Sequence, residues 1–448
     1  MAAPKRVSAG RHTNPKVVRV PAGFRIEAVA AGLDIPSGVD FDAVGNIFIT
    51  EMGSLTASAS GGPGRIVSVR RDGTIALVTE EFSGALTGLT YIEGAFYVTE
   101  HALPGRIWRV FEDGTKDVVV DGLPGGGDHP TAMAVHSHSG RIYFGQGTRT
   151  NSGVVGPDNE SWVAIHDDLH DVPGHDLTLA GKNFESPDLL SPQRDTRALT
   201  GSFKPFGVLC REGEIIPGDT LCSGSILRAD PDGGGLELFA WGLRRPLGLA
   251  VHPDGRIFCS DVGMEPRGSR PIADAGERIW QIHENGWYGW PDYAGGEPVT
   301  DGKFRPRNGP QPEFVLKEHP PLAGKPAATL PAGSGIAKFD FARSPMFGSE
   351  DTAFVALRGD LSGNGDHGFK VVRVDVGTGF VDDFIANDQP GPASRCQSGG
   401  LERPIDVRFD RTGEVMYVLD MGTVRATSGQ PAQAVPNSGV LWRVTWIG

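Results

Sequence analysis

The stretch that decides the fold runs from Gly88-Leu-Thr-Tyr through a turn to Ala95-Phe-Tyr-Val-Thr, and then to Arg106-Ile-Trp-Arg-Val. Apolar and polar residues alternate in each segment, which is typical of half-buried β-strands. The other five copies begin at Gly38, Ala132, Gly248, Ile336 and Ile405, and their closing strands begin at Arg65, Ser225, Arg278, Lys370 and Val440. A repeated unit of about 40–50 residues with four strands is typical of a propeller blade. The sequence therefore predicts an all-β fold, a six-bladed β-propeller.

Two long loops interrupt this repeat. The first is an insertion over about residues 150–222, within the third copy, and the second is an excursion over about residues 287–333, which is rich in proline and aromatic residues. Both exceed ordinary connection lengths, and loops of this size commonly form a lid or the wall of a binding site. We expect both to stand on one face of the propeller and to shape the mouth of its central channel.

The two ends of the chain complete the predicted domain organisation. Residues 1–22 form a polar N-terminal arm, and residues 23–448 form a single propeller domain. The apolar segment that starts at Phe24 is expected to pair with the last blade, because a ring closed by both chain ends protects its edge strands.

Composition and charge restrict the partners and the location. The net charge of −13 argues against nucleic acid, whose binding depends on basic side chains that neutralise phosphates. No apolar run reaches the length of a membrane span. The start, Met1-Ala-Ala-Pro-Lys-Arg, lacks the apolar core of a secretory signal. Either the protein is cytoplasmic, or a signal is absent from this chain and the protein is periplasmic or secreted.

Cysteine and histidine patterns leave two questions open. Cys210 and Cys222 bracket a polar loop and are either a disulfide or two thiols. One stretch of the insertion contains His166, Asp167, Asp168, His170, His175 and Asp176. Mixed histidine and aspartate can bind a transition metal, but no fixed spacing imposes convergence, so a solvated polar loop is the favoured interpretation.

Five motifs, taken in order, resemble one known family. They are Asp128-His129, Ala240-Trp-Gly-Leu-Arg-Arg-Pro-Leu-Gly, Gly286-Trp-Tyr-Gly-Trp-Pro, Arg403-Pro-Ile-Asp-Val and Asn437-Ser-Gly-Val-Leu-Trp-Arg-Val. Together they resemble the soluble glucose/sorbosone dehydrogenases that depend on pyrroloquinoline quinone (PQQ), and most of all the sorbosone-dehydrogenase-type branch. The resemblance covers the chain from about Gly23 onward, apart from the two loops. It implies an oxidoreductase that oxidises an aldose or sorbosone-type sugar and passes electrons to an external acceptor.

The resemblance also implies roles for particular residues. His129 matches the general base, and Asp128 matches the carboxylate that would orient it. PQQ is a planar tricarboxylate that suits guanidinium groups, and the implied cofactor-binding residues are Arg244, Arg245, Arg358 and Arg403. Calcium is implied at two places: at the quinone through the backbone carbonyls of Gly263 and Met264, and at a structural site that includes Glu277, Tyr288 and Ala294.

Three departures from the family pattern keep other functions open. Arg245 stands in place of an asparagine, Leu247 in place of a glutamine, and Ile405 in place of an arginine. Several polar contacts to the quinone are therefore missing or rebuilt. One alternative is a calcium-dependent non-redox propeller enzyme, such as a lactonase or lyase. Another is a non-catalytic propeller that binds glycans or a protein.

Overall fold

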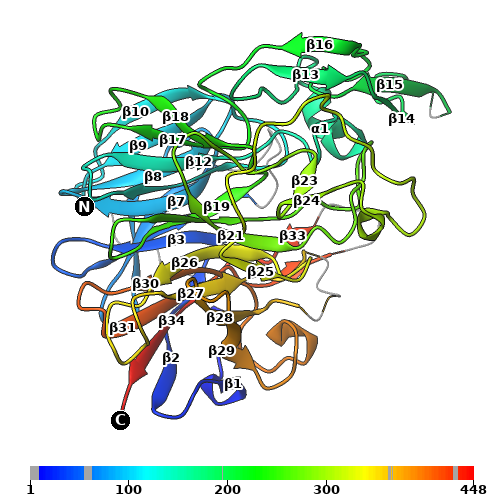
Figure 1. Cartoon of the computed structure of the whole chain (residues 1–448). Helices are drawn as coiled ribbons and strands as arrows, with labels where there is room; N and C mark the ends of the chain where they lie inside the picture. Colours follow the sequence, from blue (N-terminus) through cyan, green and yellow to red (C-terminus); the bar gives the residue numbers. More distant parts are fainter. Residues whose placement is uncertain (1–9, 55–62, 194, 362–364, 366, 427–431) are drawn as a thin grey trace.

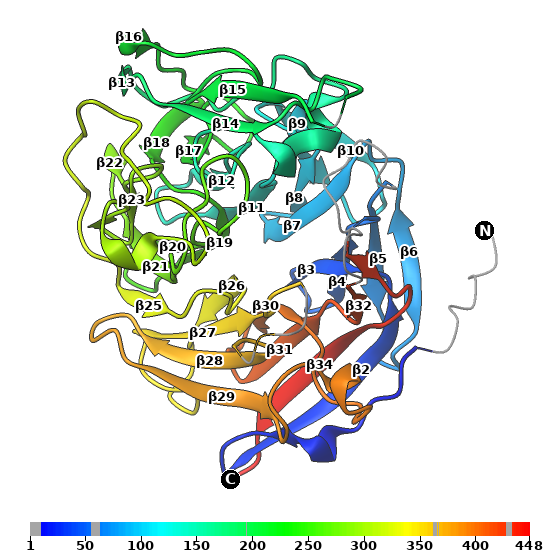
Figure 2. The ribbon, with the colours of Figure 1, turned by 90° about the vertical axis from the view of Figure 1, so that its right-hand side faces the viewer.

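The computed structural model describes residues 10–54, 63–193, 195–361, 365, 367–426 and 432–448. Six antiparallel sheets are arranged around a central axis (Figures 1 and 2). The first strand of each sheet packs against the first strands of the two neighbouring sheets, and the contact between the first and the sixth closes the ring. The predicted six-bladed β-propeller is confirmed.

Each blade has four main strands, given in order outward from the axis. Blade one is β3 (Pro36–Phe41), β4 (Ile47–Glu51), β5 (Arg65–Val69) and β6 (Ile75–Thr79), and blade two is β7 (Ala85–Ile92), β8 (Ala95–His101), β9 (Gly105–Val110) and β10 (Lys116–Leu123). Blade three is β11 (Thr131–His136), β12 (Ile142–Gln146), β17 (Ser225–Ala229) and β18 (Glu237–Trp241), and blade four is β19 (Pro246–Val251), β20 (Ile257–Asp261), β21 (Glu277–Ile282) and β25 (Ala328–Leu330). Blade five is β26 (Ile336–Phe341), β27 (Thr352–Leu357), β28 (Lys370–Asp375) and β29 (Val381–Asn387). Blade six is β30 (Pro404–Phe409), β31 (Val415–Asp420), β34 (Gly439–Trp446) and β2 (Phe24–Leu33).

The N-terminal segment closes the ring as expected. Strand β2 pairs with β34 in a register that runs from Phe24 opposite Trp446 to Leu33 opposite Gly439. Upstream of it, β1 (Val18–Arg19) pairs with the outer strand of blade five, after the short 3-10 helix η1 (Pro15–Val17). Arg11 forms an ion pair of 2.6 Å with Asp420. The described part of the predicted arm therefore packs on blades five and six, while residues 1–9, with the start of the chain, lie outside the described residues.

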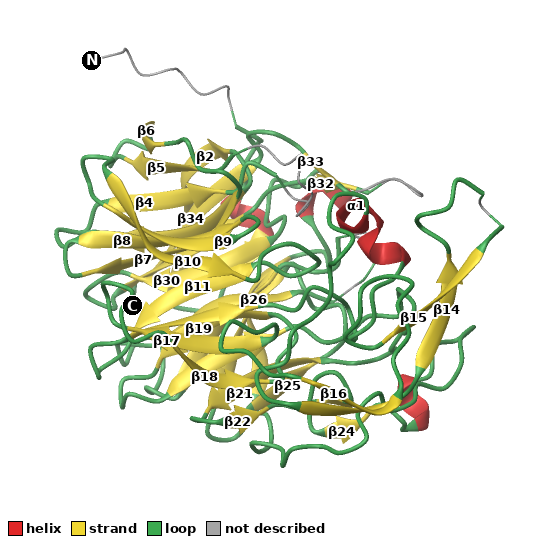
Figure 3. Cartoon of the chain, turned by 90° about the horizontal axis from the view of Figure 1, so that it is seen from above, coloured by secondary structure: helices red, strands yellow, loops and turns green. Residues whose placement is uncertain are grey.

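The two long loops fold against each other on one side of the blades (Figure 3). The insertion contains η2 (Pro157–Asn159), α1 (Glu160–Val163), β13 (Leu177–Ala180), β14 (Asn183–Pro187), β15 (Arg197–Gly201) and β16 (Glu212–Ile216). The excursion contains β22 (Gly286–Trp287), β23 (Tyr293–Ala294), β24 (Glu297–Pro298) and η3 (Gly302–Phe304). A backbone bridge joins Leu179 of the insertion to Leu316 of the excursion. Side chains of both loops pack in one apolar cluster, so the two loops form a single structural unit.

Smaller features complete the description. The remaining elements are η4 (Ala393–Arg395), β32 (Val424–Arg425) and β33 (Gln433–Ala434). Cys210 and Cys222 are buried free thiols, so the disulfide alternative does not hold. In the part of the chain that the structure describes, no helix is long and apolar enough to cross a membrane.

Candidate active site

A cavity of about 890 Å³ opens where loop ends of all six blades meet the insertion. Seven residues expected from the sequence line it: Asp128, His129, Arg245, Gly263, Met264, Glu277 and Arg358. Leu247 and Ile405, which replace polar residues of the family pattern, also line the cavity. Residues that are far apart in the sequence therefore share one enclosed space, as equivalent loop ends do in a propeller.

His129 is held in a single tautomer by Thr148. The His129 ring is 2 % exposed, and its Nδ1 lies 2.9 Å from Thr148 Oγ1 and 3.1 Å from the Thr148 carbonyl oxygen. The Thr148 hydroxyl donates its own proton to the carbonyl of Thr150, at 2.7 Å. A carbonyl can only accept, so Nδ1 of His129 is the donor and Nε2 carries a free lone pair.

The His129 imidazole is neutral. Burial lowers its pKa well below the ordinary value, and the positive charges of Arg244 and Arg245 lower it further. A neutral imidazole with a free Nε2 is a proton acceptor that needs no prior deprotonation.

Asp128 has a different partner from the one expected. Its carboxylate accepts hydrogen bonds from Arg267 at 2.7 Å and from Asn159 Nδ2 at 3.0 Å. Arg267 also pairs with Asp158 of the insertion, at 2.6 Å. Burial raises the pKa of Asp128 to about 7, although Arg267 opposes this shift. Asp128 therefore ties the insertion to the cavity rim, and Thr148, which no sequence motif singles out, is the group that orients His129.

Basic and acidic side chains both line the cavity. The four cations are Arg245, Arg267, Lys338 and Arg358, and the six carboxyl groups are those of Asp128, Asp158, Glu265, Asp274, Glu277 and Asp360. The buried Nε atoms of Arg245 and Arg358 have no hydrogen-bond partner among the described residues. Burial lowers the pKa of Arg245 to about 9, and the neighbouring charges of Arg358 and Arg244 add to this effect. Lys338 is 1 % exposed, and burial lowers its pKa to about 8. The unsatisfied guanidinium donors of Arg245 and Arg358 favour the binding of an anion beside these two residues.

The other two predicted arginines lie behind the cavity surface. Arg244 donates from Nε to the carbonyl of Asn151 at 3.1 Å and from Nη2 to the Asn151 side chain at 2.8 Å, so it anchors the insertion. Arg403 donates to the carbonyls of Arg358, at 3.1 Å, and of Asp360. It therefore supports the loop that presents Arg358. The structure brings Arg245 and Arg358 to the cavity and assigns supporting positions to Arg244 and Arg403.

The oxygens of two residues expected to bind calcium, Gly263 and Glu277, already have partners. The Gly263 carbonyl accepts from Nη1 of Arg244. The Glu277 carboxylate accepts the backbone N–H groups of Gly335, at 2.9 Å, and Ile336, and its carbonyl accepts from Arg278 at 3.1 Å.

The remaining two positions of the structural calcium site also have other contacts. The Tyr288 hydroxyl donates to the carbonyl of Gln281 at 2.8 Å, and Ala294 is buried in the apolar cluster shared by the two long loops. Calcium requires six to eight oxygen ligands. Across the described ranges, no group of three or more histidine, cysteine or acidic residues is placed to hold a metal. At Gly263, Glu277, Tyr288 and Ala294 the oxygens that remain do not supply the six to eight ligands of a calcium ion, and Met264 is buried in the same apolar cluster as Ala294.

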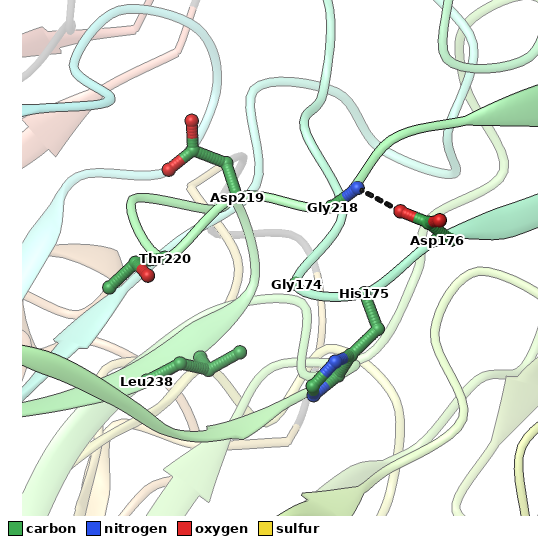
Figure 4. Close-up of a pocket in the computed structure, with 7 residues that line it drawn as sticks. All are labelled: Gly174, His175, Asp176, Gly218, Asp219, Thr220 and Leu238. Carbon is green, nitrogen blue, oxygen red and sulfur yellow. Dashed lines mark hydrogen bonds between the residues drawn. The ribbon is translucent and has the colours of Figure 1, made fainter.

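A second hollow lies in the insertion, next to β18 (Figure 4). It is lined by His175 and Asp176, and Asp176 accepts the backbone N–H of Gly218 at 2.9 Å. His166 stacks on Trp162 instead, and His170 contacts the carbonyl of Asp168. The histidines and aspartates noted in the sequence therefore have separate environments.

Comparisons with known proteins relate the fold to one class. No family model matches the chain, and no curated protein matches it. Among solved structures, the holo form of the PQQ domain of pyranose dehydrogenase from Coprinopsis cinerea is 15 % identical, with a TM-score of 0.59 over 98 % of this chain and 99 % of that one. The PQQ-bound form of an aldose sugar dehydrogenase from Streptomyces coelicolor is 16 % identical, with a TM-score of 0.52 over 95 % of this chain and 99 % of that one. An oxidoreductase (glucose dehydrogenase) from Thermus thermophilus is 18 % identical, with a TM-score of 0.54 over 94 % of this chain and 99 % of that one.

These likenesses define the class of fold. The chain has the six-bladed propeller found in glucose and aldose dehydrogenases, and the resemblance seen in the sequence is confirmed at the level of the fold. At identities this low the comparison concerns architecture, and the chemistry has to be argued from the cavity itself.

Proposed function

We propose that this protein is a PQQ-dependent oxidoreductase that oxidises an aldose or sorbosone-type sugar. The observation that carries the proposal is the presence, in one cavity, of a neutral His129 with a free Nε2 and of Arg245, whose buried Nε has no partner among the described residues. His129 is a proton acceptor, and the unpaired Arg245 favours the binding of an anion.

The cavity walls suit a planar anionic cofactor. Arg245, Arg358 and Lys338 supply the charges that a tricarboxylate needs, and guanidinium groups bind carboxylates with two parallel hydrogen bonds. Leu247 and Ile405 supply apolar surface for the faces of a ring system. The PQQ bound to the aldose sugar dehydrogenase from Streptomyces coelicolor supports this assignment. When bound, PQQ supplies the acceptor for the two electrons removed from the sugar.

The protein's own contribution is the transfer of a proton. Nε2 of His129 accepts the proton of the sugar hydroxyl, while Nδ1 keeps its hydrogen bond to Thr148. The positive charge of Arg245 disfavours the protonated imidazole. Arg245 would hold a carboxylate of the cofactor, and the partial neutralisation of its charge would raise the pKa of His129.

The proposal does not require calcium. The Gly263 carbonyl, expected to hold the ion at the quinone, accepts from the guanidinium of Arg244, which places a permanent positive charge there. The electrons leave to an external acceptor, and no step of the account depends on a metal.

A dye-coupled assay tests this function. The purified protein is treated with chelator, mixed with PQQ and supplied with a panel of aldoses and sorbosone. We expect oxidation of at least one sugar that depends on PQQ and is lost in His129→Asn, while the exposed control His175→Ala stays active. Absence of oxidation with saturating PQQ, with or without added calcium, would contradict the proposal. Hydrolysis of sugar lactones without PQQ would favour the non-redox alternative.

A further inference from the structure

We infer that His101, together with Trp162, binds a hydroxyl group of a neutral polyhydroxylated substrate and thereby determines which sugar the cavity accepts. This inference rests on the proposed function and specifies the sugar-binding part of the same cavity. In the sequence His101 carries little weight, because a lone histidine at the end of a strand is an ordinary feature.

The first observation is that His101 is buried without partners. The side chain is 5 % exposed and lines the cavity, yet neither Nδ1 nor Nε2 has a hydrogen-bond partner among the described residues. A buried polar group without a partner carries a substantial free-energy cost, and most such groups are satisfied. Because His101 lines the cavity, a ligand there can satisfy one of these nitrogens.

The position of His101 is fixed by its neighbour in β8. Because side chains alternate along a strand, Glu100 points to the opposite face. Its carboxylate accepts the backbone N–H of Gly84 at 2.7 Å and the indole N–H of Trp108 at 2.8 Å. These bonds hold the end of β8, so His101 is presented to the cavity from a rigid strand.

The charge state of His101 indicates the kind of group it binds. Burial and the charge of Arg245 lower its pKa to about 4, so the imidazole is neutral. A neutral imidazole has one donor and one acceptor. A hydroxyl group also donates and accepts, whereas a carboxylate only accepts and an ammonium group only donates. Nδ1 and Nε2 lie on different edges of the imidazole ring, so one hydroxyl partners one of them, and it can do so whether that nitrogen is the donor or the acceptor.

Trp162 supplies an apolar surface beside this imidazole. Its ring lines the cavity and lies edge-to-face with that of His101, with centroids 6.1 Å apart. Helix α1, which carries Trp162, is tied down by the bond from Asn159 to Asp128 and by the ion pair of Asp158 with Arg267. An aromatic wall with a few fixed polar groups is typical of a small-molecule site.

His101 and His129 belong to the same part of the cavity. Both line it, and the charge of Arg245 lowers the pKa of each. A sugar ring beside Arg245 is thus bounded by two neutral imidazoles. One removes the proton of the reacting hydroxyl, and the other recognises a second hydroxyl.

The test combines two variants with a series of deoxy sugars. His101→Leu removes both polar atoms at similar volume, and His101→Gln restores one donor and one acceptor. For the best sugar, we expect KM to rise about 3- to 10-fold in His101→Leu, the loss expected for one neutral hydrogen bond. His101→Gln should recover most of this loss, and the PQQ affinity of both variants should equal that of the wild type.

The deoxy series separates recognition from a structural effect. In the wild type, KM for one deoxy analogue should be raised about as much as KM for the parent sugar is raised in His101→Leu. In His101→Leu, KM for that analogue should rise no further. If the wild type and His101→Leu showed the same rise in KM for every deoxy analogue, the inference would be overturned. An unaltered KM in His101→Leu would overturn it as well, and in both cases the proposed oxidoreductase function would stand. Saturation-transfer NMR of the same sugars with the PQQ-free protein gives a readout independent of turnover. If the protein oxidises no sugar but still binds a neutral sugar through His101, the proposed function fails and this inference stands. If no neutral sugar binds in either the kinetic or the NMR experiment, the inference fails as well.

Discussion

Nδ1 of His129 lies 2.9 Å from Oγ1 of Thr148, whose own proton is directed to the carbonyl of Thr150. The tautomer of the proposed base is therefore set by a hydroxyl group and two carbonyls instead of a carboxylate. A base oriented in this way receives no stabilisation of its protonated form from a neighbouring negative charge. Its strength depends first on the burial of the ring and then on the positive charges of Arg244, Arg245 and Arg267.

Removing the Thr148 hydroxyl should weaken turnover without abolishing it. In Thr148→Val the backbone carbonyl still accepts from Nδ1 of His129, so only part of the orientation is lost. We expect kcat to fall about 3- to 10-fold, in line with one neutral hydrogen bond, with PQQ affinity unchanged. Thr148→Ser should restore the rate. Steady-state kinetics check this, and a full loss of activity in Thr148→Val together with an unchanged melting temperature would contradict the account.

Replacing His129 should separate chemistry from cofactor binding. His129→Asn removes the proton acceptor but leaves Arg245 and Arg358 in place, so kcat should fall about 10²- to 10⁴-fold while PQQ still binds. Single-turnover reduction of bound PQQ by the sugar measures the chemical step directly. Unaltered reduction in His129→Asn would exclude His129 as the base.

The fold was predictable because every blade repeats the same alternation. Apolar residues at alternate positions of Ala95-Phe-Tyr-Val-Thr mark strand β8, and equivalent segments mark the other five blades. The closing role of the segment from Phe24 follows from the need to cover an edge. The internal structure of the insertion was not predictable, because its short strands pair with each other and follow no repeat.

The cavity was predictable only in part. His129 and Arg245 lie in two of the ordered motifs, and Arg358 was found through its position in the family resemblance; all three line the cavity. Thr148 was missed and His101 was given little weight. The role of Thr148 depends on a hydrogen bond and that of His101 on the absence of one, and neither leaves a pattern in the sequence. The roles of Asp128 and Arg244 differ from expectation for a related reason. Arg267 and Asn151, their actual partners, lie on loops whose placement no spacing specifies.

Chelation should leave the folded protein unaffected. The Gly263 and Glu277 carbonyls accept from Arg244 and Arg278, so these oxygens are already engaged at the predicted calcium positions. A ligand stabilises a fold only if the native state binds it. We therefore expect the same melting temperature in excess chelator and in excess calcium, measured by calorimetry. A calcium-dependent rise in melting temperature would show that these positions do bind the ion.

The buried carboxyl group of Glu402, next to Arg403 behind the cavity, should make stability depend on pH. Burial and the nearby charge of Asp420 raise the pKa of Glu402 to about 7, and Arg11 offsets only part of this. A carboxyl group whose pKa is raised in the folded state contributes stability below its unfolded value of about 4.5, and this contribution is lost as the pH rises through about 7.

Glu402→Gln should therefore match the wild type at about pH 4 and exceed its free energy of unfolding at about pH 8, by at most about 3 kcal/mol. Urea unfolding at both pH values measures the difference, and the exposed Glu414→Gln serves as the matched control. A gain of equal size at both pH values would show that titration of Glu402 is not its source.

The most direct test of the central claim is a titration of the chelator-treated protein with PQQ, followed by absorption spectroscopy. The account predicts saturable binding of one PQQ per chain that survives in His129→Asn. In Arg245→Leu the affinity should fall by about 10-fold or more, since a charge-assisted hydrogen bond contributes about 1.5–3 kcal/mol. The matched control, Arg211→Leu, removes an exposed arginine outside the cavity and should bind PQQ as the wild type does. Absence of binding in the wild type, or equal affinity in Arg245→Leu and the wild type, would contradict the assignment of this cavity to the quinone.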